Sequence, residues 1–245
     1  MNSIINCKLL SSNVLKIIAV ISMLIDHIGA ILFPDIIIFR IIGRLAFPIF
    51  AFLISEGCRY TSNKKRYFLI MVILGVLFQI IQDIFNPHTA LNILLTFSIS
   101  ILLIYLLQLL KNNQYKIIIK ISLYFAFIAI ITAVFFFNKL ILFDYGFWGI
   151  MLPVFASIFH YNGTNETLQL LDNKRNNLIS FAICLIILIF VDYGFIQIFS
   201  ILSLPLLALY SGKRGKYNMK YFFYIFYISH LTILYIIREI ISACI

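Results

Sequence analysis

Nine predominantly apolar runs divide this chain, and most approach the roughly 20 residues that a helix needs to cross a bilayer. We expect them over residues 14–33, 36–57, 67–85, 91–110, 117–137, 140–160, 178–191, 195–210 and 221–243. They lack the alternation of membrane β-strands, so the sequence predicts an all-α fold, a polytopic transmembrane helical bundle of about nine spans in one domain over residues 1–245. Only residues 192–194 separate the seventh and eighth runs, so one broken helix or a re-entrant hairpin is an alternative there.

The composition excludes the other common classes of chain. Hydrophobic residues make up 63% of the sequence and charged residues 11%, whereas soluble domains have about 25% charged residues. These proportions exclude a soluble globular fold, a disordered chain and a disulfide-rich secreted domain. The four cysteines are scattered, with no Cys-x-x-Cys pair, so we expect neither a metal site nor a disulfide framework.

Basic residues are distributed unequally between the two sets of connecting loops. Thirteen Lys and Arg residues fall in the loops of one side, and only Lys139 falls in the loops of the other. Because cytoplasmic loops carry the excess of Lys and Arg, we expect the N-terminus in the cytoplasm, the C-terminus outside and the protein in the inner or cytoplasmic membrane. The same rule accounts for the net charge of +10, so we expect contact with the lipid bilayer and no nucleic-acid partner.

Ionisable and amide side chains interrupt the apolar runs at similar depths. His27 lies roughly 20 Å from the cytoplasmic edge, and Arg40 and Arg44 lie about 8 and 14 Å below the outer edge. A charge in hydrocarbon costs about 2.5–3.5 kcal/mol by insertion scales, so it needs a partner or a function. Polar residues of other spans that come close to this level are Gln79, Asn92, Thr96 and Asp144, with His230 near mid-membrane. Their convergence predicts a polar cavity in the outer half of the membrane.

The first two spans carry the strongest candidates for chemistry. Asp26 directly precedes His27 and could orient or charge-pair its imidazole. Arg40 and Arg44 are four residues apart and share one helix face, where they could clamp an anion or an acyl oxygen. The structural alternative is that both arginines pair with acids only to hold the helices together. Pro48 should interrupt the second helix just below the arginine pair.

Several motifs, in order, resemble the TraX family, which is named for a membrane protein that N-acetylates conjugative pilin. They comprise residues 15–19, the MLIDHIG of 23–29, the RIIGRLAFPIFAF of 40–52, 56–57, 60–61, Asn92 with Thr96, 144–146 with Gly149, and the YIFY of 224–227 leading to 230–231. The resemblance covers nearly the whole chain. One departure is that the proline usually found just before the C-terminal histidine is replaced here by Ile228-Ser229.

The resemblance implies an acyltransferase that passes an acetyl group from cytosolic acetyl-CoA to an acceptor at the outer half of the membrane. The acceptor would be a peptide or pilin-like N-terminus, such as that of a membrane-anchored or exported peptide, or a glycan hydroxyl. His27 would be a general base or an acyl carrier, Asp26 would orient it, Arg40 and Arg44 would stabilise an oxyanion or hold a phosphate, and His230 would carry a second proton. The expected substrate contacts are Gln79, Asn92, Thr96, Asp144 and Tyr227. The cations expected to attract acetyl-CoA are Arg59, Lys64, Lys65 and Arg66.

Two other classes of function use the same residues. A small-solute transporter or permease would employ the intramembrane His, Asp and Arg cluster as a proton relay or substrate site. The small size of the chain and its lack of an internal repeat disfavour this alternative. A non-enzymatic assembly factor for a membrane peptide is the third hypothesis. Acetyl transfer by purified protein separates the first hypothesis from the other two.

Overall fold

The computed structural model describes residues 9–85, 90–112, 114–138, 142–192, 194–216 and 220–244. These residues confirm the predicted all-α class, because every regular secondary-structure element within them is a helix. Strand-like pairing in these ranges is limited to two isolated bridges, Leu10 with Tyr210 and Leu91 with Phe143. One of the four cysteines, Cys7, and two of the loop cations counted above, Lys8 and Lys139, lie outside the described ranges.

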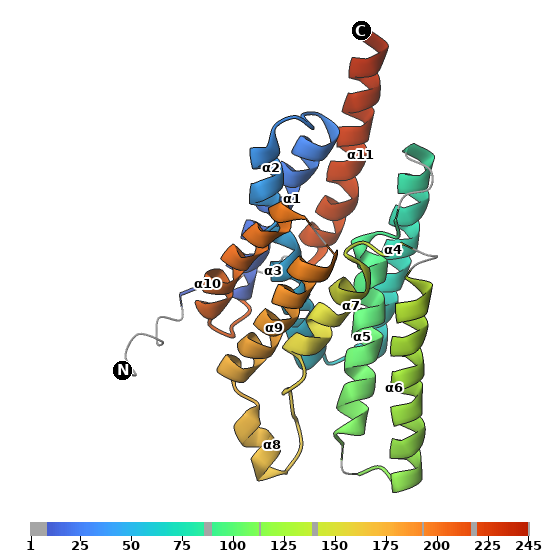
Figure 1. Cartoon of the computed structure of the whole chain (residues 1–245), viewed down its shortest axis with the longest axis vertical. Coiled ribbons are helices and arrows are strands. Elements are labelled where there is room, and N and C mark those ends of the chain that lie inside the picture. The colour runs from blue at the N-terminus through green and yellow to red at the C-terminus, as the bar shows by residue number, and fades with distance from the viewer. Residues whose placement is uncertain are drawn as a thin grey trace. The chain divides into compact units, whose positions relative to one another are not determined.

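Contacts within the chain define two compact units, residues 1–50 with 193–245 and residues 51–192. The single domain expected over residues 1–245 stays a prediction. The first unit combines the two ends of the chain, blue and red in Figure 1. Its elements are α1 (Ser12–Ile31), α2 (Ile37–Gly43), the 3₁₀ helix η2 (Phe195–Leu202), α10 (Ser203–Ala208) and α11 (Lys220–Cys244). In this unit α1 packs against α2 and α11, and η2 packs against α2.

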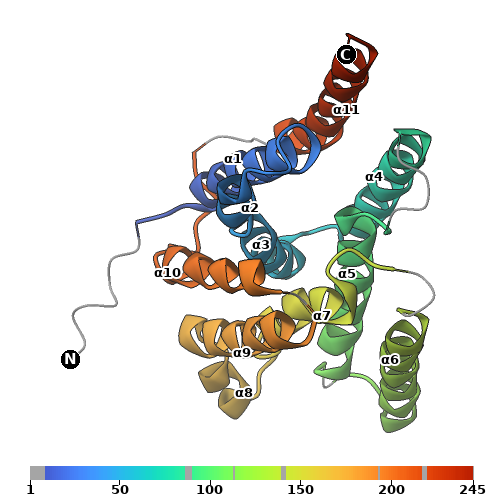
Figure 2. The same cartoon turned by 45° about the horizontal axis from the view of Figure 1, so that its top comes forward.

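The second unit is built around a central helix, α5. Its elements are α4 (Lys64–Phe85), α5 (Ile93–Leu110), α6 (Ile117–Phe137), α7 (Gly146–Ala156), α8 (Glu166–Leu171) and α9 (Lys174–Asp192). Helix α5 contacts α4, α6 and α7, and α7 in turn contacts α9. Figure 2 shows α7 and α6 on either side of α5. Helix α3 (Ala46–Tyr60) runs from the first unit into the second.

Seven helical segments in the described ranges are long and apolar enough to cross a membrane, so the predicted count of nine is not confirmed. The sixth run forms only the 11-residue α7, which is about 17 Å long. The eighth run folds as η2 followed by α10, and each of these is short. The predicted orientation stays a prediction.

The expected interruption of the second span is confirmed. Helix α2 ends at Gly43 and α3 begins at Ala46. Pro48 therefore lies in the first turn of α3, where its missing N–H removes no helical hydrogen bond. The interruption leaves Arg40 and Arg44 at the end of α2, one turn apart.

Two glycines allow α1 and α2 to approach closely. A Cβ atom added to Gly43 would overlap the side chain of Asp26, and one added to Gly29 would lie 2.5 Å from Cβ of Phe39. Small residues at such positions are typical of closely packed membrane helices. The resulting contact places Asp26 directly against the end of α2, where both arginines lie.

Candidate functional site

The central feature of the first unit is a hydrogen-bonded pair of histidines from α1 and α11. His27 Nδ1 lies 2.8 Å from His230 Nε2, although 203 residues separate the two in the chain. The two rings stack with their centroids 5.0 Å apart. His230 is buried, and His27 is partly exposed. The structure thus brings together the two histidines that the sequence assigned to the site.

A backbone carbonyl assigns the tautomers of this pair. His230 Nδ1 lies 2.7 Å from the carbonyl oxygen of Phe226, and a carbonyl oxygen only accepts, so Nδ1 must carry the proton. In a neutral ring, Nε2 of His230 is then an acceptor, and it accepts from Nδ1–H of His27. The one ring nitrogen of the histidine pair that keeps a free lone pair is therefore His27 Nε2, which can accept a proton.

Asp26 and the two arginines form an ion cluster next to this pair. Arg40 Nη1 donates to Asp26 Oδ2, and Arg44 Nη2 donates to Asp26 Oδ1, each at 2.8 Å. Arg40 Nη1 also donates to the backbone carbonyl of Asp26 at 3.2 Å, and Arg44 Nε donates to the carbonyl of Arg40. Two cations on one carboxylate leave this cluster with one net positive charge next to His27.

These contacts differ from the role that the sequence predicted for Asp26. Its carboxylate was expected to orient the neighbouring His27, but both of its oxygens accept from arginine instead. The physical reason is that adjacent helix positions differ in direction by about 100°, and two guanidinium groups attract a carboxylate more strongly than a neutral imidazole does. The hydrogen bond of His27 is made with His230 instead.

Gln197 is a buried polar residue next to the ion cluster that the sequence did not single out. Arg44 Nη1 donates to its Oε1 at 3.3 Å, while its Nε2 is buried and has no hydrogen-bond partner in the structure. The buried residues of η2 are Gln197 and Ser200, and the Oγ of Ser200 also has no partner. Residues three apart eclipse each other in a 3₁₀ helix, so the two form a polar stripe. That i, i+3 spacing within an apolar run was the only available signal.

Aromatic rings complete the surroundings of His230. The Phe226 ring stacks on His230 with the centroids 4.9 Å apart and the planes 8° apart. Tyr227, predicted to contact substrate, lies edge-on to His230 at 6.0 Å. The helix continues through this region without the family's proline, and that continuity supplies the i−4 carbonyl of Phe226 to His230.

The other predicted substrate contacts lie in the second unit, and the hydrogen bonds described below join them to other residues of that unit. Asn92 Oδ1 accepts from the backbone N–H groups of Leu94 and Leu95, so Asn92 caps α5. Its Nδ2 donates to the carbonyl of Gly75 and to Gln79 Oε1. These bonds give Asn92 and Gln79 a structural role, and substrate binding by them stays a prediction.

Thr96 and Asp144 meet at the start of α7. Thr96 Oγ1 donates to the backbone carbonyl of Asp144 at 3.2 Å. Tyr145 and Gly146, which follow, have φ angles of 59° and 57°. Left-handed backbone is common for glycine and rare for tyrosine, so the Asp-Tyr-Gly motif forms a tight helix start here.

The cations predicted to attract acetyl-CoA differ in their contacts and exposure. Arg59 forms a bidentate ion pair with Asp172, at 3.0 and 2.9 Å. Lys64 donates to Gln108 Oε1 at 2.6 Å, whereas Lys65 and Arg66 are exposed. Arg59 therefore holds the segment before α9 to the end of α3.

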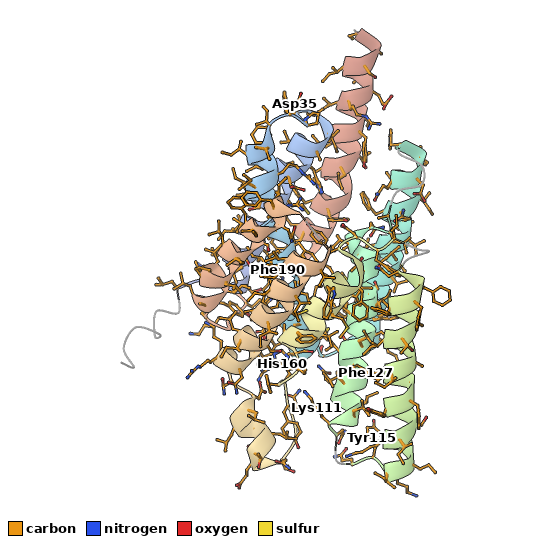
Figure 3. The ribbon with its side chains drawn as sticks, viewed as in Figure 1. Asp35, Lys111, Tyr115, Phe127, His160 and Phe190 are labelled. Atoms are coloured by element: carbon orange, nitrogen blue, oxygen red, sulfur yellow. The ribbon has the colours of Figure 1, made fainter. Side chains whose placement is uncertain are left out.

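A second contact, through Lys111, holds the segment that follows α7 (Figure 3). Its Nζ donates to the backbone carbonyls of Ile158 and His160. Burial lowers the pKa of Lys111 to about 8. Burial first, and then the positive charge of Arg59, lowers the pKa of His160 to about 4, so His160 is neutral near pH 7. Glu56 Oε1 lies 3.6 Å from its Nε2.

Comparisons with known proteins place the chain among its relatives. Residues 11–238 match the family described as TraX protein. The chain is also similar to an uncharacterized protein of Rickettsia prowazekii (strain Madrid E), with 42% identity over 85 residues. That match covers 34% of the chain and 32% of the relative, so the chain spans about a third of the length of this curated relative. No solved structure matches the chain.

Proposed function

This chain belongs to the TraX family, and from that membership we propose that it is an integral membrane acyltransferase that moves an acetyl group from acetyl-CoA to an acceptor amine or hydroxyl. The observation that carries the proposal is the His27–His230 pair, whose tautomers leave the basic lone pair on His27 Nε2. The acceptor classes are a peptide N-terminus of the pilin type and a glycan hydroxyl.

His27 acts as the general base in this proposal. Its Nε2 takes a proton from the acceptor as the acceptor nitrogen or oxygen bonds to the thioester carbonyl carbon. The imidazolium that forms donates through Nδ1 to His230 Nε2, which stabilises the positive charge. When the carbon–sulfur bond breaks, the thiolate of CoA takes this proton, so His27 returns to its initial state.

The charge that develops on the carbonyl oxygen needs donors. Arg44 and Gln197 are the candidates, because the Asp26 cluster carries a net positive charge and Gln197 Nε2 is a buried donor without a partner. Preorganised donors of this kind are worth about 10²–10³ in kcat each. The buried amide donor therefore fits an acyl oxygen better than it fits a purely structural role.

The acyl donor also needs a place for its phosphates. Basic residues of the same unit follow α10, and the backbone carbonyls of Lys213 and Arg214 accept from the N–H groups of Ser12 and Asn13. This contact places the basic segment at the start of α1, roughly 20 Å along the helix axis from His27. We assign the nucleotide of acetyl-CoA to this segment and its thioester to the His27 end, in preference to the predicted cluster Arg59–Arg66, because Arg59 is paired with Asp172.

Acetyl-CoA turnover by purified protein tests the proposal. The assay measures release of free CoA thiol with an added peptide or glycan acceptor in nanodiscs. We expect turnover by the natural chain and a loss of about 10²–10⁴ in His27→Ala. Ile21→Ala is the matched control, because Ile21 lies on the exposed face of the same helix. Absence of thiol release with every acceptor, together with solute uptake in proteoliposomes, would favour the transporter alternative.

A further inference from the structure

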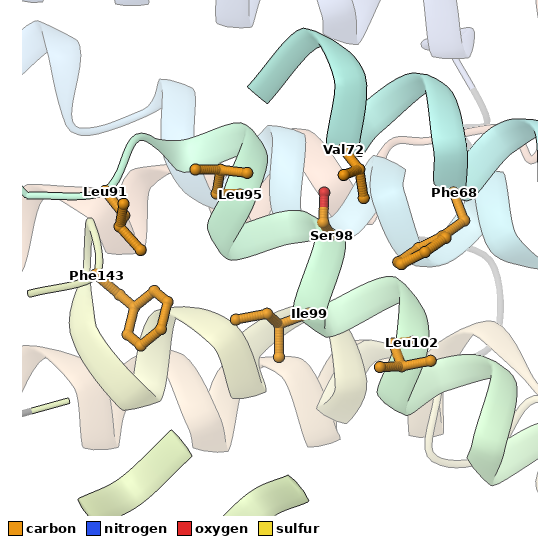
Figure 4. Close-up of a pocket in the computed structure, with 8 residues that line it drawn as sticks. All are labelled: Phe68, Val72, Leu91, Leu95, Ser98, Ile99, Leu102 and Phe143. Carbon is orange, nitrogen blue, oxygen red and sulfur yellow. The ribbon is translucent and has the colours of Figure 1, made fainter. Parts of the chain in front are cut away.

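An apolar groove lies in the second unit (Figure 4), whereas the histidine pair belongs to the first. Its cavity volume is about 260 Å³. The lining residues come from α4, α5 and the segments before α5 and α7: Phe68, Val72, Leu91, Leu95, Ser98, Ile99, Leu102 and Phe143. Ser98 is the polar member, and its hydroxyl donates to the carbonyl of Leu94, so the lining is effectively apolar.

The groove lies next to the exposed face of α4. Neighbouring side chains of α4 point outward, with Leu69 52% and Ile73 54% exposed. An apolar groove among such residues is bordered by hydrocarbon when the helix spans a membrane. Its apolar lining therefore suits a hydrocarbon chain that enters from the side.

Cations continue the groove at one end. Lys65, Phe68 and Val72 are spaced i, i+3 and i+7, so they lie in one stripe along α4, with Lys65 one turn beyond the groove. Lys64 is held at the same end, with its Nζ 2.6 Å from Gln108 Oε1 and 5.3 Å from the ring centroid of Tyr105. Tyr105 lies one turn beyond the groove residue Leu102 on α5. Both walls of the groove thus lead to a positively charged end.

We propose that this groove and its basic end form a binding site for an anionic phospholipid. One acyl chain would lie along α5 between Val72 and Ile99, and the phosphate would contact Lys64 and Lys65. Cations near a membrane surface attract anionic headgroups by about 1 kcal/mol each, which corresponds to about fivefold in affinity. A zwitterionic lipid offers the same chain without the net charge, so headgroup charge sets the preference.

Native mass spectrometry of the full chain, equilibrated with phosphatidylglycerol or phosphatidylcholine, tests the site. We expect the natural chain to retain phosphatidylglycerol preferentially. Lys64→Gln and Lys65→Gln should each weaken that preference about fivefold. Arg175→Gln is the matched control, because Arg175 is an exposed cation at the start of α9.

A second pair of variants tests the chain-binding part. Val72→Trp should fill the groove and lower the number of retained lipids, whereas Ile73→Trp, on the exposed neighbouring position, should leave it unchanged. Equal retention of the two lipids by the natural chain would overturn the proposal. So would unchanged retention in Val72→Trp, or a mass showing that a second copy of the chain covers the groove. Loss of preference on added acetyl-CoA alone would reassign the basic end to the nucleotide.

Discussion

His27 and His230 are not interchangeable, because the carbonyl of Phe226 decides which ring nitrogen of His230 carries a proton. His230 therefore accepts from His27 and cannot itself offer a basic nitrogen to a substrate without breaking that bond. In the proposed reaction the pair would work as an orienting group and a base, in the manner of a catalytic triad whose third member is a backbone carbonyl.

This arrangement predicts a graded response at His230. His230→Leu removes the acceptor for His27 Nδ1–H, so we expect acetyl-CoA turnover to fall by about 10²–10⁴. His230→Gln supplies an amide oxygen that can accept from the same N–H, so it should retain several times more activity than the leucine variant. The measurement is kcat at matched protein levels. Equal activity of the two variants would contradict the tautomer assignment.

The ion cluster predicts a large effect on stability at Asp26. Asp26→Asn leaves two partly buried guanidinium groups around a neutral side chain, and breaking a buried pair costs about 3–5 kcal/mol. We expect a clearly lower midpoint of thermal unfolding in detergent. Arg238→Gln is the control, since it removes an ion pair whose members are 37% and 56% exposed, and such pairs contribute about 0–1 kcal/mol. Similar unfolding midpoints for the two variants would show that the Asp26 cluster contributes no more to stability than an exposed ion pair does.

At the scale of elements, the contact between α1 and α2 depends on Gly43. A Cβ at this position would overlap Asp26, so Gly43→Ala must push the helices apart and lengthen both Arg–Asp bonds. We expect loss of turnover with the protein still inserted in the membrane. Gly194→Ala is the matched control, because a Cβ there meets nothing within 4 Å. Turnover near that of the natural chain in Gly43→Ala would show that activity does not depend on the close contact between Gly43 and Asp26.

The sequence predicted the helices well but predicted their pairing only in part. Runs of apolar residues located the long helices, and the cost of intramembrane charge identified Arg40 and Arg44. Pairing between His27 and His230 depends on how α1 packs against α11, and no local spacing encodes that contact. Gln197 was missed because one amide in a short apolar run resembles a tolerated polar residue until the 3₁₀ geometry aligns it with Ser200.

On the scale of the whole molecule, acidity should weaken the second unit. The folded pKa of His160, about 4, lies below its ordinary value of 6.5, so between these values the unfolded chain binds more protons. Stability from this group is therefore complete above pH 6.5 and is lost as the pH falls toward about 4. Arg59, Lys111, Asp172 and Glu56 are the charged groups that lie around the ring.

Thermal unfolding at a series of pH values measures this effect. We expect the midpoint for the natural chain to fall between pH 6.5 and 4, and the fall to be smaller in His160→Gln, which does not titrate. The outcome that contradicts the argument is an identical pH profile for the two proteins.

The predicted orientation is a second property of the whole molecule. Asn63→Cys, introduced next to the basic start of α4 in a Cys244→Ser background, reports on which side this loop lies. We expect no labelling by a membrane-impermeant maleimide in intact cells and labelling after permeabilisation, because the positive loops should be cytoplasmic. Labelling from outside would reverse the topology and the direction of acyl transfer.

The order in which the chain is synthesised gives the long separation within the histidine pair a consequence. At about 5–20 residues per second, Arg44 follows Asp26 after about 1–4 s, whereas His230 follows His27 only after about 10–40 s. The residues with permanent charge can therefore neutralise one another within the first helical hairpin. His27 is without its partner His230 for this longer time, and a neutral imidazole can enter hydrocarbon without carrying a charge. If the proposed mechanism holds, the nascent chain would thus remain catalytically silent until α11 is made, so that acyl transfer would report the insertion of that helix.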